Sequence, residues 1–173
     1  SCLQTISQNK QSCVIVPTTV LAKQHMLYFS NLLQDSGLRI ELITSATTKK
    51  QKEKIVADLA IGKIDILIGT HAILEDDVKF QNLGLAIIDE QHRFGVMQRL
   101  KLVEKSSDVD ALLMSATPIP RSLMMGLYGD MDISILNEKP KNRQEIETLV
   151  MSEKKAGDIY DAVKRTIAKG EKI

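Results

Sequence analysis

Short apolar runs alternate with helical stretches along this chain, and this alternation is the strongest constraint on its fold. The stretch between the first two runs, residues 18–37, has apolar side chains at helical spacing and ends at a glycine. Strands alternating with helices predict an α/β fold with a mostly parallel sheet and right-handed crossovers. The runs that we interpret as strands are residues 13–16, 38–43, 64–68, 85–88, 111–114 and 132–136.

Two adjacent carboxylates, Asp89 and Glu90, directly follow the apolar run Leu85–Ile88. Ligands of open α/β sheets bind at the carboxyl ends of the strands. A hydrated Mg²⁺ takes one or two carboxylates there, beside the phosphates of a nucleotide. We therefore interpret Asp89 as the carboxylate that holds Mg²⁺ through water, and Glu90 as the catalytic base that orients an attacking water. The alternative is a solvated strand end before a helix, where acidic side chains are also favoured.

The composition leaves the partner open but restricts the class of protein. The chain has 173 residues, of which 43% are hydrophobic and 26% charged, so a soluble globular protein is expected. Because its net charge is only +1, a DNA-binding face would have to be a local patch. The cysteines and histidines lack disulfide or zinc-ligand spacing, and no apolar run approaches a membrane span. A cytoplasmic setting is expected.

Four lysines, Lys49, Lys50, Lys52 and Lys54, crowd the first turns of the helix predicted to end at Gly62. They oppose the helix dipole, which is a small cost that a patch facing phosphates would tolerate. A solvated helix end explains the same pattern equally well.

The pattern changes after residue 136, which predicts a domain boundary. Residues 137–146 are polar, charged and contain Pro140, as a linker does. Beyond them, residues 147–151 are interpreted as a strand and residues 153–169 as an amphipathic helix. Because one strand and one helix cannot form a core, we interpret residues 1–136 as a first domain and residues 147–173 as the truncated beginning of a second. The side of the helix expected to be buried carries Ala156, Ile159, Tyr160, Val163 and Ile167.

Four stretches resemble, in order, the motifs of one family, the RecG-type DNA helicases. The run Leu127–Asp132 also follows that family, so the resemblance covers essentially the whole chain. Thr19 and Lys23 depart from the family's pattern, which usually has Glu at the first position and often at the second. The four stretches are Pro17–His25 (motif Ia), Ile68–Ala72 (the Gly-Thr-His-Ala loop), Leu85–Gly95 (the Walker B box, Asp-Glu-Gln-His-Arg-Phe-Gly) and Met114–Arg121 (motif III).

The resemblance implies a RecA-like, P-loop NTPase-type three-layer sandwich, with residues 1–136 as the first motor lobe. It implies an ATP- and Mg²⁺-dependent motor acting on branched or forked DNA, such as stalled forks and Holliday junctions, in recombination and DNA repair. The partners within the same parent protein would be a second helicase lobe and a wedge domain. A bacterial-type, nucleoid-associated location is implied as well.

The resemblance also assigns roles to individual residues. Ser115 and Thr117 are expected to hydrogen-bond to Gln91 or His92 and to couple the nucleotide state to the rest of the motor. The loops at the other strand ends are expected to contact the DNA backbone, which holds register without reading sequence. These DNA-binding candidates are Pro17, Thr18, Thr44, Ser45, Gly69, Thr70 and His71.

The phosphate-binding loop Gly-x-x-x-x-Gly-Lys-Ser/Thr does not occur in this sequence. The chain is therefore expected to begin just after that loop, and to hydrolyse ATP negligibly by itself. Three alternatives stay open. One is a transcription-repair coupling translocase, whose acidic box usually reads Asp-Glu-Glu-His, so that Gln91 favours the RecG type. The others are a metal-dependent phosphohydrolase, which needs further converging ligands, and a non-catalytic DNA-binding module.

Overall fold

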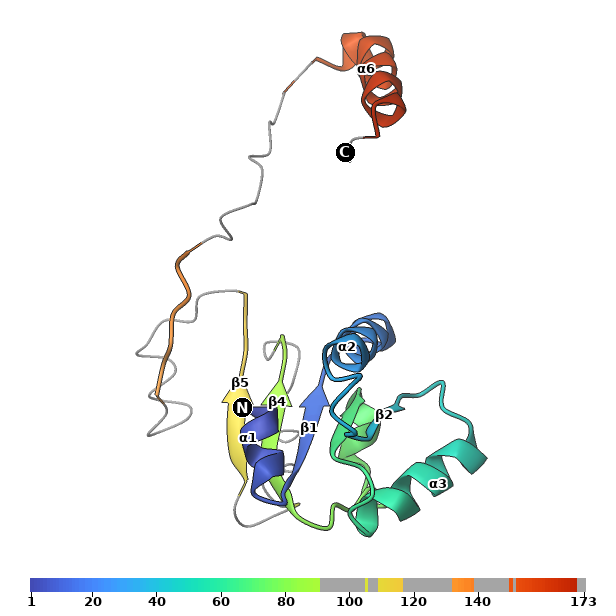
Figure 1. The fold of residues 1–173 in the computed structure, drawn as a ribbon. Helices are drawn as coiled ribbons and strands as arrows, with labels where there is room; N and C mark the ends of the chain where they lie inside the picture. Colours follow the sequence, from blue (N-terminus) through green and yellow to red (C-terminus); the bar gives the residue numbers. More distant parts are fainter. Residues whose placement is uncertain (91–104, 106–108, 117–131, 139–149, 151, 171–173) are drawn as a thin grey trace. The chain divides into compact units, whose positions relative to one another are not determined.

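The computed structural model of this chain describes residues 1–90, 105, 109–116, 132–138, 150 and 152–170. It divides into two compact units, Ser1–Gly126 and Leu127–Ile173. The first unit contains a sheet of five parallel strands in the order β2-β3-β1-β4-β5 (Figure 1). The strands are β1 (Gln11–Ile15), β2 (Ile40–Ile43), β3 (Ile66–Gly69), β4 (Leu83–Ile88) and β5 (Asp110–Leu113).

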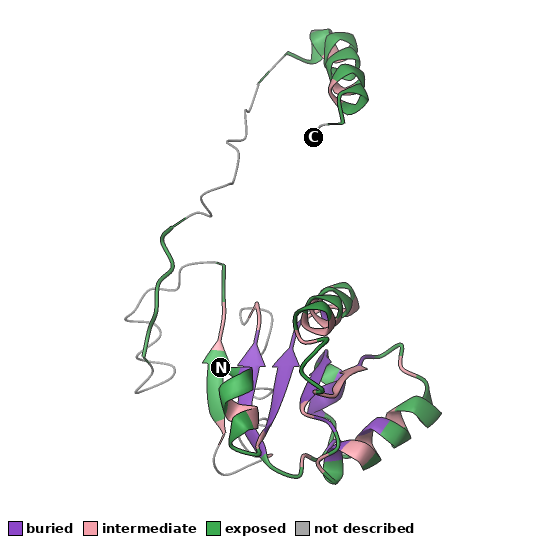
Figure 2. Ribbon diagram, viewed as in Figure 1, coloured by how far each residue is buried: buried purple, intermediate pink, exposed green. Residues whose placement is uncertain are grey.

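Helices cover both faces of this sheet, because successive side chains of its central strands point to opposite sides. Cys13 and Ile15 of β1 belong to one core cluster, which includes Ile55 and Leu59 of α3 (Lys49–Ala60). The opposite face packs against α1 (Cys2–Ser7) and α2 (Thr19–Leu32). Figure 2 shows the inner strands buried from end to end. The predicted α/β three-layer fold with a parallel sheet is confirmed.

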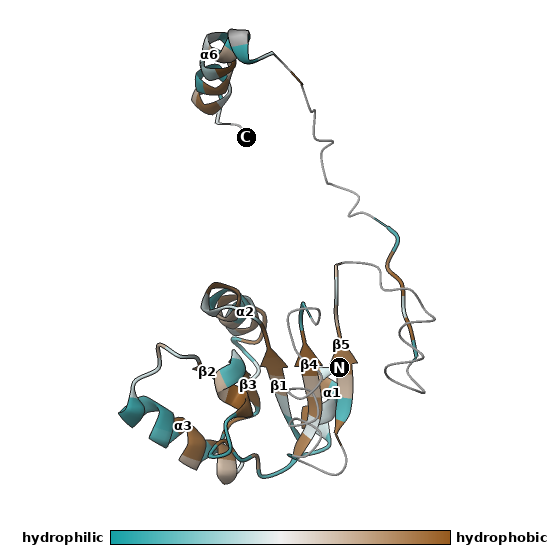
Figure 3. Ribbon diagram, turned by 180° about the vertical axis from the view of Figure 1, so that it is seen from behind, coloured by the Kyte–Doolittle hydropathy of each residue, from teal (hydrophilic) through white to brown (hydrophobic). Residues whose placement is uncertain are grey.

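Side-chain caps fix where the helices α2 and α3 begin. The Thr18 hydroxyl accepts a hydrogen bond from the Leu21 N–H at 3.3 Å and starts α2. Thr48 and Gln51 form a reciprocal capping box at the start of α3. The first turns of α3 are hydrophilic and its later turns hydrophobic, as Figure 3 shows. Both caps lie in the loops that follow β1 and β2.

A buried glutamine joins three elements at the amino end of the sheet. Gln11, the first residue of β1, is 5% exposed. Its Nε2 donates to the carbonyl oxygens of Leu59 and Ile64 at 3.0 and 2.8 Å, and its Oε1 accepts from the Asn82 N–H at 3.1 Å. All of its strong polar groups are therefore satisfied, which removes the cost of burying an amide. The sequence pattern began this strand at Cys13 because Gln11 and Ser12 are polar.

The prediction of a sixth strand at residues 132–136 is wrong. Residues 132–138 have no regular secondary structure, and Ile135 and Leu136 are 73% and 96% exposed. Alternating apolar residues make a strand only when a neighbouring strand completes the ladder, and no described strand pairs with this segment. Of the strand predicted at residues 147–151, only residue 150 is described, without regular structure.

In the second unit, the predicted helix is observed as η3 (Glu153–Lys155) followed by α6 (Ala156–Ala168). None of the residues on its expected apolar side is buried among the described residues: Ala156 and Val163 are half-buried, and Tyr160 and Ile167 are 68% and 61% accessible. The division into a first lobe, a linker at 137–146 and a second lobe stays a prediction. No helix in the described ranges is both long and apolar enough to cross a membrane.

Candidate functional site

The carboxyl ends of all five strands lie in one row. Ile15 of β1 is in register with Gly69 of β3 and with Ile88 of β4. Ile43 pairs with Gly69, and Leu113 pairs with Ile88, so the row runs across the whole sheet. Every loop that leaves a strand at this edge therefore begins at the same level. This edge is where ligands bind in open α/β sheets.

Asp89 is the first residue after β4, as the sequence predicts. Its N–H donates to the Ile15 carbonyl oxygen at 2.9 Å, which continues the ladder one residue beyond the strand. Its Oδ1 accepts the Glu90 N–H at 2.9 Å, and its Oδ2 lies 3.2 Å from His25 Nε2. About a quarter of the side chain is exposed. The backbone and both carboxylate oxygens are thus held in place.

Glu90 has a left-handed backbone, with φ at 54°. Among non-glycine residues this conformation is uncommon, and for residues other than Asn, Asp and His it is rarer still. Such conformations cost about 1–3 kcal/mol and cluster at functional sites. The turn begins directly after the strand, so the Glu90 side chain leaves the sheet at the same edge as Asp89.

The carboxylate of Asp89 fits a hydrated magnesium ion. A carboxylate offers about four acceptor positions, so its two hydrogen bonds leave capacity for metal-bound waters. One or two partly exposed carboxylates are what Mg²⁺ takes when it stays largely hydrated. In the part of the chain that the structure describes, no three His, Cys, Asp or Glu side chains form a metal site by themselves. The further ligands that a two-metal phosphohydrolase needs are thus not found in that part.

The candidate DNA-binding residues follow β1, β2 and β3, on the side of the sheet away from β5. Their exposure separates them into two groups. Ser45 and His71 are exposed, and Pro17 and Thr18 are half-buried. Thr44, Gly69 and Thr70 are buried.

The buried candidates have structural roles. Thr44 Oγ1 accepts the Ala46 N–H at 3.2 Å, and the Thr44 N–H donates to Thr47 Oγ1 at 2.9 Å, so the hydroxyls build the turn after β2. The Thr70 N–H donates to the Ile43 carbonyl oxygen at 3.2 Å. Exposed side chains at this edge of the sheet are therefore better placed to contact a phosphate than Thr44 or Thr70.

The residues expected to couple the nucleotide state are only partly within the described chain. Ser115 lies two residues beyond β5 and is exposed. Met114, between them, donates its N–H to the Ile88 carbonyl oxygen at 2.8 Å, so β5 continues the row at the edge of β4. Gln91, His92 and Thr117 lie outside the described residues, and their roles stay predictions.

The lysines at the start of α3 are not equivalent. Lys52 Nζ lies 2.5 Å from Glu75 Oε2 and 2.7 Å from Asp77 Oδ2, so it joins α3 to the loop after η1 (His71–Leu74). The hydrogen bonds that Lys52 donates to Asp77 and Glu75 raise its pKa. Lys49 and Lys50 are exposed at the first turn, beside the Thr44–Thr48 loop. The pattern did not distinguish Lys52 from these two.

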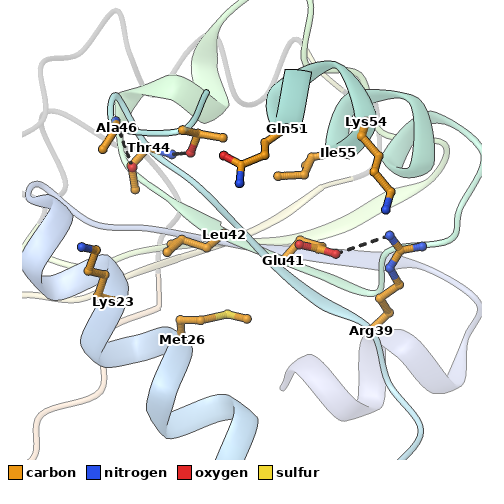
Figure 4. Close-up of a pocket in the computed structure, with 11 residues that line it drawn as sticks. Lys23, Met26, Arg39, Glu41, Leu42, Thr44, Ala46, Gln51, Lys54 and Ile55 are labelled. Atoms are coloured by element: carbon orange, nitrogen blue, oxygen red, sulfur yellow. Dashed lines mark hydrogen bonds and ion pairs between the residues drawn. The ribbon is translucent and has the colours of Figure 1, made fainter. Parts of the chain in front are cut away.

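A groove of about 500 Å³ lies beside the outer strand β2, between α2 and α3 (Figure 4). Lys23 and Met26 contribute from α2, and Lys54 and Ile55 from α3. Arg39, at its far end, lies 2.6 Å from Asp58, and this hydrogen bond raises the pKa of the guanidinium and lowers that of the carboxyl. The groove is not lined by Asp89 or Glu90.

One residue of this region, His25, was missed by the sequence pattern. In the sequence, His25 is only the last residue of the motif Ia stretch, yet its ring contacts Asp89 from a different element. Cys13 is buried in the same strand that leads to this edge, and burial raises its pKa to about 12, so its thiol stays protonated. The motif Ia stretch contained His25, but only the fold, which brings α2 to the residue that follows β4, could reveal its neighbour.

Residues 1–125 match the family model described as DEAD/DEAH box helicase, and the chain belongs to that family. Within it, the predicted resemblance to RecG-type helicases is confirmed. The ATP-dependent DNA helicase RecG of Aquifex aeolicus is 44% identical in an alignment of 173 positions, which covers 99% of this chain and 22% of that protein.

A solved structure of RecG bound to a three-way DNA junction is 41% identical, with a TM-score of 0.72, over 93% of this chain and 21% of that one. The expected RecA-like fold is therefore confirmed as well. The transcription-repair-coupling factor of Haemophilus influenzae is 40% identical over 97% of this chain and 15% of that protein. The chain spans about a fifth of the length of the RecG relatives that it matches.

Proposed function

We propose that this chain is part of an ATP-dependent DNA helicase that remodels branched DNA, such as stalled forks and Holliday junctions, in recombination and repair. The observation that carries the proposal is the shared edge of the sheet. Asp89 and Glu90 follow β4, while the exposed or half-buried DNA-binding candidates follow β1, β2 and β3 in the same row. The names of the RecG relatives and the three-way junction in the solved RecG structure support it.

In this proposal the residues of the Walker B box have different roles. Asp89 would hold a hydrated Mg²⁺ through water, and that ion would neutralise charge on the phosphates of ATP when bound. Glu90 would accept a hydrogen bond from the attacking water and orient it. Gln91, His92, Ser115 and Thr117 would respond to the nucleotide state.

The DNA would lie against the other half of the edge. Ser45, His71, Thr18 and the residues beside them would contact the backbone, with Lys49 and Lys50 close by. Contacts of this kind position a protein on DNA without reading its sequence. A second helicase lobe and a wedge domain of the same parent protein would complete the motor. The cytoplasmic, nucleoid-associated location stays a prediction.

The chain of 173 residues contains no Gly-x-x-x-x-Gly-Lys-Ser/Thr loop. We therefore expect it to hydrolyse ATP negligibly by itself, because positioning and electrostatics supply most of the catalysis of phosphoryl transfer. The similarity to transcription-repair-coupling factors makes a duplex-DNA translocase the second candidate.

The test is ATP turnover by the full-length protein that carries this chain, with forked DNA, with duplex DNA and without DNA. We expect forks to stimulate turnover strongly, and Glu90→Gln to abolish it while nucleotide still binds. Stimulation by duplex DNA alone would favour the translocase. Turnover that is independent of DNA would overturn the proposal.

A further inference from the structure

The His25 ring on α2 contacts the Asp89 carboxylate at the end of β4. His25 Nε2 lies 3.2 Å from Asp89 Oδ2, and the two side chains are 25% and 24% exposed. Because an ionised carboxylate only accepts hydrogen bonds, the ring nitrogen is the donor. The other carboxylate oxygen accepts the Glu90 N–H. Two donors from different parts of the chain therefore fix the plane of one carboxylate.

The helix that carries His25 is anchored at both the sheet and the DNA-binding edge. Ala22 is fully buried against the sheet, and Met26 and Phe29 pack on the same cluster. Its N-cap is Thr18, which lies in the loop proposed to contact DNA. His25 follows seven residues later, so one helix spans the distance from that loop to Asp89.

We propose that His25 is a positioning residue, which orients Asp89 for the hydrated metal and transmits DNA contact at the start of α2 to that carboxylate. This inference rests on the proposed function. Partners that hydrogen-bond to carboxylates that ligate a metal set the orientation of those ligands, and their removal weakens metal binding by about 10–100-fold. Because Asp89 would act through water, we expect the lower end of that range here. A displacement of α2 caused by DNA at Thr18 would move the donor of that hydrogen bond, because the helix is a rigid element.

Two polar substitutions separate this role from simple packing. In His25→Gln the side-chain amide nitrogen can reach the place of the imidazole Nε2, so the hydrogen bond to Asp89 is kept. In His25→Asn the amide falls at the level of Nδ1 and cannot reach. Both side chains are polar and smaller than histidine, so they disturb the packing of α2 in similar ways. Asn31→Ala, at an exposed position of the same helix, is the control for changes to α2 itself.

The measurement is the Mg²⁺ concentration needed for half-maximal binding of a non-hydrolysable ATP analogue to the full-length protein, by calorimetry, with and without forked DNA. We expect forked DNA to lower this midpoint in the wild-type protein, in His25→Gln and in Asn31→Ala. His25→Asn is expected to raise the midpoint by about tenfold and to remove its dependence on DNA. Thermal unfolding of each variant confirms that all four proteins are folded.

Two results would overturn the inference: an unchanged midpoint in His25→Asn, or a defect of equal size in His25→Gln. Its failure is distinguishable from failure of the proposed function. If Glu90→Gln abolishes fork-stimulated turnover while His25→Asn binds Mg²⁺ normally, only the role of His25 is wrong. If forks do not stimulate the wild-type protein, the proposed function itself is wrong.

Discussion

Gly69 lies so close to Ile43 that a Cβ atom on it would be 2.1 Å from the Ile43 carbonyl oxygen. That oxygen is part of the backbone of β2 and accepts the Thr70 N–H, so it cannot move aside without breaking the ladder. The glycine at the end of β3 is thus required by the spacing of two strands. This requirement holds whether or not DNA passes over the loop.

We expect Gly69→Ala to lower the free energy of unfolding of the chain by about 1–3 kcal/mol, the usual cost of forcing extra atoms into a packed site. Gly157→Ala is the matched control, because a Cβ there meets nothing within 4 Å inside α6. That change should be neutral or slightly stabilising. Chemical denaturation of the three proteins checks both values. Full stability of Gly69→Ala would contradict the steric explanation.

The elements that the sequence predicts correctly are those with strong local patterns. The inner strands β3 and β4, and β1 from Cys13 onward, are apolar or glycine, and Thr18 caps α2 at the start of the stretch with helical spacing. The acidic box lies at a strand end because the apolar run stops at Ile88. Residues 132–136 have an apolar pattern but no partner among the described strands, and local pattern cannot show whether a partner exists.

Contacts between segments that are distant in the chain could not be predicted from the sequence pattern. His25 and Asp89 are 64 positions apart in the sequence, with two crossovers between them, and only the strand order brings α2 to the end of β4. The same holds for Gln11, which the predicted strand at residues 13–16 left out because its side chain is polar. Its three partners lie 48 to 71 residues away along the chain.

Gln11→Met should destabilise the chain by about 3 kcal/mol, because two carbonyl groups and one N–H would lose their buried partner. The apolar replacement has a similar length, so the loss reports on hydrogen bonds more than on volume. Gln4→Met, at an exposed position of α1, is the control and should change the unfolding free energy by less than about 0.5 kcal/mol. Urea titration compares the two. Equal stabilities would mean that water replaces the amide.

The ion pairs of Lys52 predict a dependence of stability on pH. The hydrogen bond from Lys52 lowers the pKa of Asp77 below its ordinary 3.8. A carboxyl with a lowered folded pKa stabilises the fold above its unfolded pKa, and this contribution disappears as the pH falls through the folded pKa. Lys52→Met should therefore be less stable than wild type at pH 7, by no more than about 1 kcal/mol for such an exposed pair.

The two proteins are expected to converge in stability below the lowered pKa of Asp77. Unfolding measured across this pH range, with Lys50→Met as the control, checks the prediction. A difference that persists unchanged in acid would assign the effect of Lys52 to packing of its aliphatic part.

Lys49 and Lys52 should differ in their effect on DNA binding by the full-length protein. Lys49→Ala is expected to weaken binding to forked DNA and to reduce the salt dependence of the affinity by about one phosphate contact. Lys52→Ala should leave that salt dependence unchanged, since its ammonium group is held by Glu75 and Asp77. Binding titrations at several salt concentrations separate the two. Equal effects would indicate that DNA contacts both lysines in the first turns of α3.

Because Glu90 has a left-handed backbone, the residue that is best for stability at this position differs from the residue that is needed for activity. Glycine adopts that conformation without strain, so Glu90→Gly should raise the melting temperature while removing the proposed base. A library of variants selected only for heat resistance would therefore be drawn toward glycine at position 90 and would lose turnover. A protein in which Glu90 persists under such selection must also be under selection for its chemistry.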